Sequence, residues 1–354
     1  MQEKKVLLSI KDLDVRFRVR GRILKAIRNI SLDIYEGESI AIVGESGSGK
    51  SVFTKTFAGM LESNGYIEKG DILFRNEDGN YINLAKRKTS DDWSQIRGRK
   101  IATVFQDPMT SLNPIITIGK QISSIILKHQ KCSETEARRR ALSLMEMVGI
   151  PNAKSRFDDY PFQYSGGMRQ RIVIAIALSC QPKVLICDEP TTALDVTIQA
   201  QILQLIKELQ KEFHYTIVFI THDLGVVANI ADRVAVLYAG QIVELGNVDE
   251  IFYDPRHPYT WALLSSLPQL SQKGSKLYSI TGTPPSLYNR IVGDAFAPRN
   301  PYCMKIDTLL EPPMFPVSDS HYAKTWLLDP NAPKIEKPEE IQNIHEKLIR
   351  AFSI

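Results

Sequence analysis

One short stretch near the beginning of the chain constrains the fold more than any other. It has the form glycine, four variable positions, glycine, lysine and serine, which is the phosphate-loop pattern. Residues 39–43 before it predict a short buried strand, and residues 52–60 after it predict the opening of a helix. Strand, glycine turn and helix are the context that the pattern needs. Its residues are Gly44, Glu45, Ser46, Gly47, Ser48, Gly49, Lys50 and Ser51.

The chemistry of this stretch suits a phosphate group. Glycines let the backbone curl so that several N–H groups point inward at phosphate oxygens, and the N-terminus of the following helix adds a partial positive charge. We expect Lys50 to reach the β- and γ-phosphates of a nucleotide and the Ser51 hydroxyl to coordinate Mg²⁺. Val52, which follows the loop, is included in the predicted binding site. The alternative is a glycine-rich turn that matches by accident, which the flanking strand and helix disfavour.

Length and composition are those of an ordinary globular chain. With 354 residues we expect two domains, or one large domain with an appendage, and a hydrophobic content of 43% allows a sizeable core. The net charge of +4 is weak, and basic residues alternate with acidic ones, which argues against a nucleic-acid binder.

The sequence predicts a soluble, cytoplasmic chain. Its N-terminus lacks the apolar region of a signal peptide, and no window approaches the ~18 apolar residues that a membrane span needs. The cysteines have neither metal-ligand nor disulfide-framework spacing, which fits a reducing compartment. They are Cys132, Cys180, Cys187 and Cys303.

The first part of the chain predicts an antiparallel β-region. Residues 6–43 alternate apolar and polar side chains, as strands with one solvated face do. Phe17 in this region has two interpretations: a ring on which a nucleotide base stacks, or a strand residue packed into the sheet. Residues 66–98 are polar and turn-rich, and predict a hairpin and loop.

A small helical insert is predicted next. Apolar residues take a helical period from about residue 116 to 150, and residues 133–136 form a capping-box pattern at a helix start. Residues 164–171 then open a helix over 172–179.

The remaining pattern predicts an α/β fold. The apolar run at residues 184–187 suits a central strand covered on both faces. A helix at about 198–212, a strand at 216–220 and strands at 234–238 and 241–244 follow. This order of strands and helices predicts a mainly parallel sheet.

Prolines cluster from about residue 254 onward. They predict a loop-rich C-terminal appendage, because proline lacks an N–H donor and interrupts regular elements. A final helix is expected at about residues 338–352.

Two carboxylates follow the apolar run. Asp188, at the end of the predicted strand, would hold Mg²⁺ directly or through water. Glu189 would lie next to the γ-phosphate and orient the attacking water, and removing such a base typically costs about 10²–10⁴ in rate. The alternative is a pair of solvated acids at a strand end, which the buried run and the phosphate loop disfavour.

Three further features join this set. Gln106 ends a strand and can offer its amide oxygen to Mg²⁺ or water, and His222 ends another strand and could hydrogen-bond the γ-phosphate. Residues 165–167, Ser-Gly-Gly before a helix, form a second phosphate-reading device. The simplest use of two such loops in one chain is a dimer in which each loop completes the partner's site.

Together these motifs resemble the ATP-binding cassette (ABC) ATPases of membrane transporters, over residues of about 6–250. The resemblance implies a P-loop NTPase cassette with a RecA-like, mainly parallel sheet core, an antiparallel β subdomain and a helical subdomain, with ATP and Mg²⁺ as its ligands. It also implies a role for each motif. The residues that carry it, besides the loop, are Gln106, Ser165, Gly166, Gly167, Asp188, Glu189, Ala193, Leu194, Asp195 and His222.

In terms of that family, the loop is the Walker A motif, and Lys50, Glu189 and His222 are the catalytic set. Asp188 is the Walker B aspartate, a metal ligand together with Ser51 and Gln106. Gln106 also touches the membrane subunit, Glu189 is the catalytic glutamate, and His222 is the switch histidine.

The signature motif and the D-loop are also implied to contact nucleotide. The signature departs from its commonest form at the first and last positions, but its Ser-Gly-Gly is intact. These contacts are Tyr164, Ser165, Gly166, Gly167, Met168 and, in the D-loop, Asp195.

A narrower resemblance is to the oligopeptide/dipeptide importer ATPases, in particular the oligopeptide-permease D-type subunit of Gram-positive bacteria. It is carried by residues 105–114, 164–171 and 254–260. The function implied is an ATPase at the cytoplasmic face of the cell membrane that powers oligopeptide uptake. A dipeptide or nickel importer of the same subfamily is the alternative; a soluble cassette acting on nucleic acid or ribosomes is disfavoured because the chain holds one cassette and no long insert.

The implied partners are a second ABC ATPase, two permease subunits and an external peptide-binding protein, without nucleic acid. The implied domains are a nucleotide-binding domain at residues 1–253, with a helical subdomain at about 116–180, and an importer-type extension at 254–354.

Many relatives carry a C-terminal cysteine cluster that holds an iron–sulfur centre. In this chain Asp294, Asn300 and Asp307 stand where cysteines are expected, and Cys303 remains. Because a cluster normally needs four thiolates, no iron–sulfur cluster is expected.

Overall fold

The computed structural model describes residues 5–87, 89–192, 194–267, 280–339, 341–344 and 347. The chain divides into two compact units, each built from three separate segments of the sequence. The first unit consists of Met1–Leu7, Tyr35–Ser39 and Lys86–Ile220, and the second of Leu8–Ile34, Ile40–Ala85 and Thr221–Ile354.

The first unit contains the parallel strands that the apolar runs predict. Strands β6 (Ile101–Val104), β7 (Val184–Asp188) and β8 (Thr216–Thr221) lie in the order β6-β7-β8. Along β7 every side chain is buried until Asp188, which is half-buried. The prediction of a central strand at 184–187 is therefore confirmed, and its last residue reaches the edge where solvent begins.

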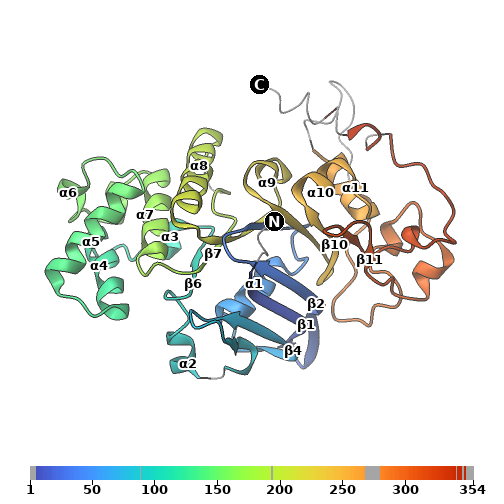
Figure 1. The fold of residues 1–354 in the computed structure, drawn as a ribbon, viewed down its shortest axis with the longest axis horizontal. Coiled ribbons are helices and arrows are strands. Elements are labelled where there is room, and N and C mark those ends of the chain that lie inside the picture. The colour runs from blue at the N-terminus through green and yellow to red at the C-terminus, as the bar shows by residue number, and fades with distance from the viewer. Residues whose placement is uncertain are drawn as a thin grey trace. The chain divides into compact units, whose positions relative to one another are not determined.

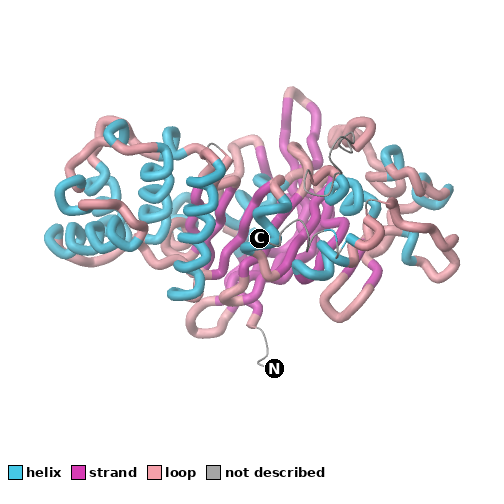
Figure 2. Tube along the Cα trace, turned by 90° about the horizontal axis from the view of Figure 1, so that it is seen from above, coloured by secondary structure: helices cyan, strands magenta, loops and turns pink. Residues whose placement is uncertain are grey.

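The same unit holds a group of helices, which confirms the predicted helical insert. Helices α4 (Ile118–His129), α5 (Glu134–Met147) and α7 (Gly166–Leu178) pack on one another. Figure 1 shows them beside the short α6 (Ala153–Arg156), and Figure 2 shows this part as helices joined by loops. Further helices of the unit are α2 (Ser90–Ser94), α3 (Pro108–Ser111) and α8 (Val196–Phe213).

Two details of the helix predictions are wrong. Helix α7 begins at Gly166 and not at residue 172, because Ser165 caps it by accepting a hydrogen bond from the Met168 N–H at 3.3 Å. The predicted capping box at α5 is half formed: Ser133 accepts from the Glu136 N–H, but the Glu136 carboxylate binds the arginines of the next turn.

The second unit begins with the predicted antiparallel sheet. Its strands lie in the order β2-β1-β4-β5, drawn partly side by side in Figure 1. Along β2 buried and exposed residues alternate, which confirms a sheet with one solvated face. The bounds are β1 (Val6–Val19), β2 (Arg22–Tyr35), β4 (Gly65–Arg75) and β5 (Tyr81–Asn83).

A second sheet in this unit carries the phosphate loop. Strand β3 (Ser39–Val43) runs parallel to β9 (Arg233–Tyr238), which pairs with β10 (Gln241–Asn247) in antiparallel fashion. Strands β12 (Tyr322–Ala323) and β11 (Phe315–Pro316) then extend the sheet. The sequence predicts loops for this last segment, because strands of two residues leave no alternation to detect.

Helices and short turns complete the second unit. Its helices are α1 (Lys50–Ala58), α9 (Leu224–Ile230), α10 (Val248–Tyr253) and α11 (Pro258–Ser265). The C-terminal segment from residue 280 is loop-rich, as predicted, and most of the expected helix at 338–352 lies outside the described residues. Short 3-10 turns of the chain are η1 (Leu84–Lys86), η2 (Pro161–Gln163), η4 (Ala297–Arg299), η5 (Lys305–Thr308) and η6 (Trp326–Leu328).

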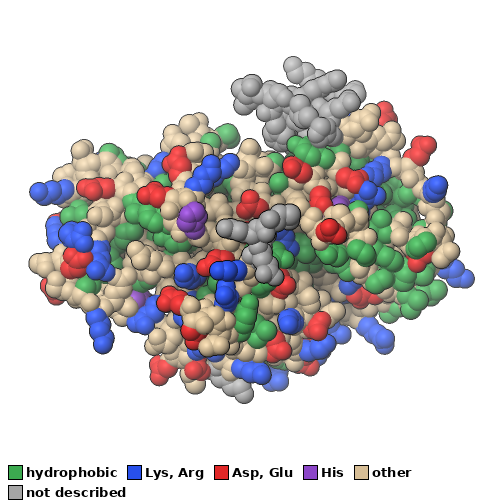
Figure 3. All heavy atoms as spheres, viewed as in Figure 1, with side chains coloured by type: hydrophobic (Ala, Val, Ile, Leu, Met, Phe, Trp, Pro, Cys, Tyr) green, Lys and Arg blue, Asp and Glu red, His purple; other side chains and the backbone are tan. Residues whose placement is uncertain are grey.

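Two surface properties follow from the described residues. None of the helices within them is long and apolar enough to cross a membrane. Acidic and basic side chains are interspersed over the face seen in Figure 3, as the weak net charge and the alternating pattern of the sequence imply.

Candidate functional site

The phosphate loop is a tight turn between β3 and α1 that only glycine can make at two positions. Gly44 has φ +150° and Gly49 φ +107°, which other residues rarely adopt. A Cβ on Gly44 would lie 2.1 Å from the Leu237 carbonyl oxygen, and one on Gly49 would lie 2.9 Å from the Ala26 carbonyl oxygen. Because both obstacles are backbone atoms, neither can move aside.

Lys50, the first residue of α1, folds back across this loop. It is 6% exposed, and its Nζ donates to the carbonyl oxygens of Gly44 at 2.7 Å and Glu45 at 3.0 Å. No side chain caps the N-terminus of α1, so its first N–H groups are oriented toward the loop. An ammonium group and a helix N-terminus at one turn favour an anion there.

The other residues of the loop differ in exposure. Ser46 and Gly47 are exposed, whereas Ser48 is buried and its N–H donates to the Glu45 carbonyl oxygen at 3.2 Å. Ser51 and Val52 are half-buried on the first turn of α1.

In the first unit, Glu189 follows β7 in a strained conformation. Its φ is +46°, and a residue other than glycine in such a region costs about 1–3 kcal/mol. Its N–H donates to the Ile220 carbonyl oxygen of β8 at 2.9 Å, and its carboxylate accepts from Thr192 Oγ1 at 3.1 Å and from Gln106 Nε2 at 3.2 Å. The strained backbone therefore carries a carboxylate whose Oε2 accepts two side-chain hydrogen bonds.

The structure thus brings two predicted residues, Gln106 and Glu189, into contact. The contact uses the amide nitrogen of Gln106, whereas the sequence predicts its amide oxygen as a ligand. Thr192 was missed by the sequence analysis, and its position three residues after Glu189 is the signal that could have identified it.

The Ser-Gly-Gly motif forms the N-terminus of α7. Ser165 is exposed and Gly166 half-buried, whereas Gly167 is buried against Ile198 of α8. Asp195 is exposed and caps α8, since its carboxylate accepts from the Ile198 N–H at 3.0 Å. The motif and the cap therefore meet through Ile198.

Two aromatic residues expected to contact nucleotide are packed inside instead. Phe17 is 7% exposed, and its ring lies on Gly65 of the neighbouring strand β4, so it takes the packed-strand interpretation. Tyr164 is 2% exposed, its hydroxyl donates to the Arg156 carbonyl oxygen at 2.5 Å, and burial raises its pKa to about 12. The expectation that these side chains contact a ligand is corrected accordingly.

The remaining predicted positions lie at element ends. His222 is exposed and follows β8 directly, just before Asp223 caps α9. Met168 is half-buried in the first turn of α7. Ala193 lies outside the described residues.

Metal ligation has little support from side-chain clusters. In the described part of the chain, no three or more His, Cys, Asp and Glu side chains gather into a group that could hold a metal by themselves. A nucleotide-bound Mg²⁺ needs fewer protein ligands, because phosphate oxygens and water supply the others. Asp188 is half-buried at the end of β7, and Ser51 lies on α1 in the other unit.

The positions expected for iron–sulfur cysteines do not fit a cluster. Asp294 and Asn300 each accept from a backbone N–H two residues later, at 3.0 and 2.9 Å, and Asp307 accepts from one three residues earlier at 2.6 Å. Their side chains therefore brace local turns, and thiolates are the ligands that a cluster needs. Cys303 is exposed.

Comparison with family models identifies two regions. Residues 27–192 match the model described as ABC transporter. Residues 243–306 match the model described as Oligopeptide/dipeptide transporter, C-terminal region.

Curated relatives match the chain over nearly its whole length. AmiE, an oligopeptide transport ATP-binding protein of Streptococcus pneumoniae, is 62% identical over 347 residues, which are 98% of this chain and 96% of that protein. OppD, an oligopeptide transport ATP-binding protein of Bacillus subtilis, is 55% identical over 348 residues, with the same coverage of 98% and 96%.

A solved structure shares the fold. The ATP-binding cassette MJ0796, in a dimeric post-hydrolysis state bound to ADP and phosphate, is 30% identical with a TM-score of 0.59. The match covers 68% of this chain and 98% of that one, and so leaves part of this chain without a counterpart in the cassette.

Proposed function

The chain belongs to the ABC transporter ATP-binding proteins of the oligopeptide and dipeptide transport subfamily, and from this premise we propose that it powers the uptake of oligopeptides through membrane permease subunits. It has the ABC cassette fold, with a mixed sheet core and an antiparallel subdomain, and a C-terminal region of the oligopeptide/dipeptide type. As a member of this family it is an ATPase whose hydrolysis of ATP drives transport.

Residues 1–253 form the nucleotide-binding domain in this proposal. Its helical subdomain takes about residues 116–180, and residues 254–354 are the importer-type extension. The domain would lie at the cytoplasmic face of the membrane and contact the permease subunits near Gln106.

ATP binds at the phosphate loop. The loop fits a triphosphate for two reasons. Gly44 and Gly49 permit a tight turn that no side chain at these positions would allow. Lys50 places its ammonium beside a helix N-terminus that has no side-chain cap. Lys50 releases its carbonyl partners to bind the β- and γ-phosphates. By their motifs, Ser51 and Asp188 would each serve as a Mg²⁺ ligand, directly or through water, and the ion would neutralise phosphate charge.

Glu189 orients the attacking water. Thr192 and Gln106 both donate to Oε2 of its carboxylate, which restrains the carboxylate in one orientation for the general-base role. His222, exposed after β8, hydrogen-bonds the γ-phosphate and reports its loss.

A complete site needs a second ATPase subunit. The exposed Ser165 at the N-terminus of α7 binds the nucleotide held by the partner's phosphate loop, together with Gly166, Gly167, Met168 and Asp195. Dimerisation is typical of ABC cassettes, and MJ0796 is a dimer. We propose that the partner is a similar but distinct chain.

Cargo reaches the permeases from an external peptide-binding protein. Oligopeptides are the proposed solute because AmiE and OppD are oligopeptide transport proteins. A dipeptide is the alternative, since the matched C-terminal family comprises oligopeptide and dipeptide transporters alike.

The observation that carries the catalytic assignment is the strained Glu189 at the end of a buried strand. We expect Glu189→Gln to lower the ATPase rate of the reconstituted transporter by about 10²–10⁴-fold, since the amide cannot accept a proton. The matched control is Glu212→Gln, the same change at an exposed position of α8, which leaves the rate unchanged. A normal rate for Glu189→Gln would remove this residue from catalysis.

A further inference from the structure

Glu45 of the phosphate loop is held by two side chains from far along the sequence. Arg299 forms a bidentate ion pair with its carboxylate, with Nη1 donating to Oε2 at 2.6 Å and Nη2 to Oε1 at 2.9 Å. Tyr259 contacts the same residue through its hydroxyl, which accepts the Glu45 N–H at 2.8 Å. All three residues belong to the second unit. Both partners lie within the C-terminal family region at residues 243–306, Tyr259 on helix α11 and Arg299 in the turn η4.

The guanidinium of Arg299 is held in place by contacts other than its ion pair with Glu45. Its side chain is 4% exposed, Nε donates to the Thr281 carbonyl oxygen at 2.9 Å, and Nη1 donates to the Tyr238 hydroxyl at 3.3 Å. The ion pair with Glu45 raises the pKa of Arg299 above its ordinary value. Since a planar fork held on all sides loses little further entropy, the pair imposes one geometry on the loop.

Aromatic packing fixes the second partner. Tyr259 on α11 lies 4.5 Å from Tyr238 of β9, centroid to centroid, and 5.4 Å from Phe296. Phe296 meets Tyr238 edge to face at 5.3 Å. These three rings pack into one cluster. Phe296 of the cluster also caps the turn η4, whose last residue is Arg299.

The contacts continue from Glu45 to the lysine. The Glu45 carbonyl oxygen accepts from Lys50 Nζ, so the residue gripped by Arg299 and Tyr259 is also one that positions the ammonium. Removal of Arg299 would release the loop and would leave the Glu45 carboxylate without its counter-charge beside the place where phosphates bind. Both effects weaken the binding of an anion.

We propose that Arg299 and Tyr259 are positioning residues, through which the C-terminal region holds the phosphate loop in its nucleotide-binding shape and so sets its affinity for ATP. The inference rests on the proposed assignment of the loop to the phosphates. The region is then part of the nucleotide site and not only an attachment to it.

The test measures nucleotide affinity separately from turnover. We expect Arg299→Gln in the full chain to raise the Kd for a fluorescent ATP analogue by about tenfold, since a charge-assisted bidentate contact is lost. In the assembled transporter the KM for ATP rises while kcat at saturating ATP stays near normal, because no reacting group is changed. Tyr259→Phe gives a smaller rise. Arg299→Lys restores part of the affinity, and Glu45→Gln combined with Arg299→Gln restores the part that stems from the unpaired carboxylate.

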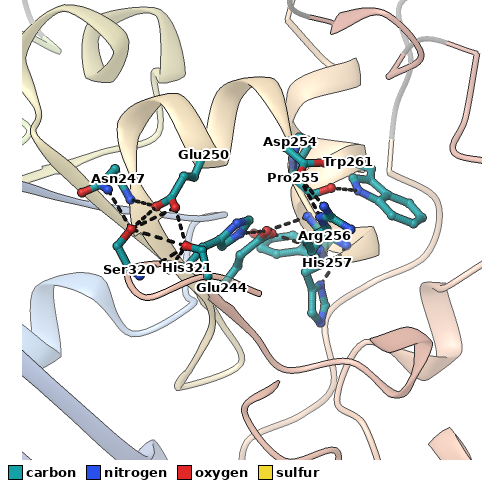
Figure 4. Close-up of polar contacts among 12 residues, drawn as sticks. Glu244, Asn247, Glu250, Asp254, Pro255, Arg256, His257, Trp261, Ser320 and His321 are labelled. Carbon is teal, nitrogen blue, oxygen red and sulfur yellow. Dashed lines mark hydrogen bonds and ion pairs between the residues drawn. The ribbon is translucent and has the colours of Figure 1, made fainter. Parts of the chain in front are cut away.

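The matched control is a second buried pair of the C-terminal region, which Figure 4 shows. Glu244 of β10 accepts from His321 Nε2 at 2.8 Å and from the backbone N–H groups of Arg256 and His257 at 2.6 and 3.0 Å. We expect His321→Ala to lower the melting temperature without changing the Kd for nucleotide. If that variant does not fold, Ser320→Ala, which removes hydrogen bonds to Glu250, serves instead.

Three outcomes separate the possible errors. Unchanged affinity in Arg299→Gln overturns the inference, and so does an equal loss of affinity in His321→Ala, which would make the effect one of general stability. Lys50→Ala tests the underlying assignment: if it binds nucleotide normally, the loop itself has been misassigned. Loss of binding in Lys50→Ala with normal binding in Arg299→Gln leaves the loop assignment intact and rejects the positioning role alone.

Discussion

At the scale of single residues, two adjacent glycines at the start of α7 differ in what surrounds them. A Cβ on Gly167 would lie 2.6 Å from Ile198 Cγ2, whereas one on Gly166 would have Leu194 as its neighbour at 3.7 Å, an ordinary contact. Gly166 therefore leaves space at the proposed nucleotide-binding surface, whereas Gly167 permits close packing of α7 on α8.

This difference predicts unequal effects of the same substitution on stability. Gly167→Ala lowers the free energy of unfolding by about 1–3 kcal/mol through overpacking, and Ile198→Ala added to it restores part of the loss. Gly166→Ala, the matched control, leaves the free energy of unfolding nearly unchanged. Chemical denaturation of the three variants decides: equal losses for Gly166→Ala and Gly167→Ala would contradict the packing difference.

The sequence predicts which residues belong to the site where a motif defines them, but it does not predict contacts between residues far apart in the chain. The loop at residues 44–51 and the strand-end carboxylates could be found because their spacing is local. The contact between Glu45 and Arg299 joins residues 254 positions apart, so no local period or spacing reveals it. Tyr164 and Phe17 show the opposite failure, since an aromatic residue in or near a motif was assigned to the ligand although its ring fills the core.

At the scale of elements, the histidine that caps α11 has a charge state that affects stability. His257 caps the helix, its Nδ1 accepting from the Tyr259 N–H at 3.0 Å, and it is fully buried. Burial lowers the pKa of His257 to about 3, and the nearby Lys324 also disfavours the charged form. An Nδ1 that must remain an acceptor requires the neutral ring.

The sign of the pH effect follows from that depressed pKa. Below the unfolded-state pKa of about 6.5 the unfolded chain binds a proton that the folded chain does not, so stability falls as the pH falls, by about 1.4 kcal/mol per pH unit. His257→Asn keeps a capping acceptor without this titration. We therefore expect the stability advantage of the wild type over this variant to shrink between pH 7 and pH 5, as followed by denaturation. A difference independent of pH would contradict a buried neutral histidine.

Elements long enough to show an apolar run or a helical period were predicted well. Short elements that exist only through tertiary pairing were not. The parallel strands β7 and β8 read as apolar runs, and α4 and α5 as helical periods. The start of α7 was placed late because two glycines disfavour helix, and the Ser165 cap with the packing on α8 outweighs that preference. Strands β11 and β12 exist because β10 offers them an edge.

At the scale of the whole molecule, one chain of the proposed dimer supplies residues to two different nucleotide sites. The phosphate loop belongs to the second unit and the Ser-Gly-Gly motif to the first. If two subunits clamp nucleotide between them, Lys50 serves the site completed by the partner, and Ser165 serves the site built on the partner's own loop. One chain then influences both hydrolysis events.

Combining two substitutions in this chain tests that arrangement in the transporter assembled with its second ATPase subunit. Lys50→Ala impairs one site, and Ser165→Arg, which places a bulky side chain at an exposed position, blocks the other. We expect the double variant to have a far lower ATPase rate than either single variant, because both sites are then damaged. If both residues served one site, the double variant would be no slower than the slower single one, since residues that act as a unit are not additive. Ser133→Arg removes the cap of α5 in the same unit and controls for the cost of a lost helix cap, so a loss of rate there would show that the effect of Ser165→Arg is one of folding.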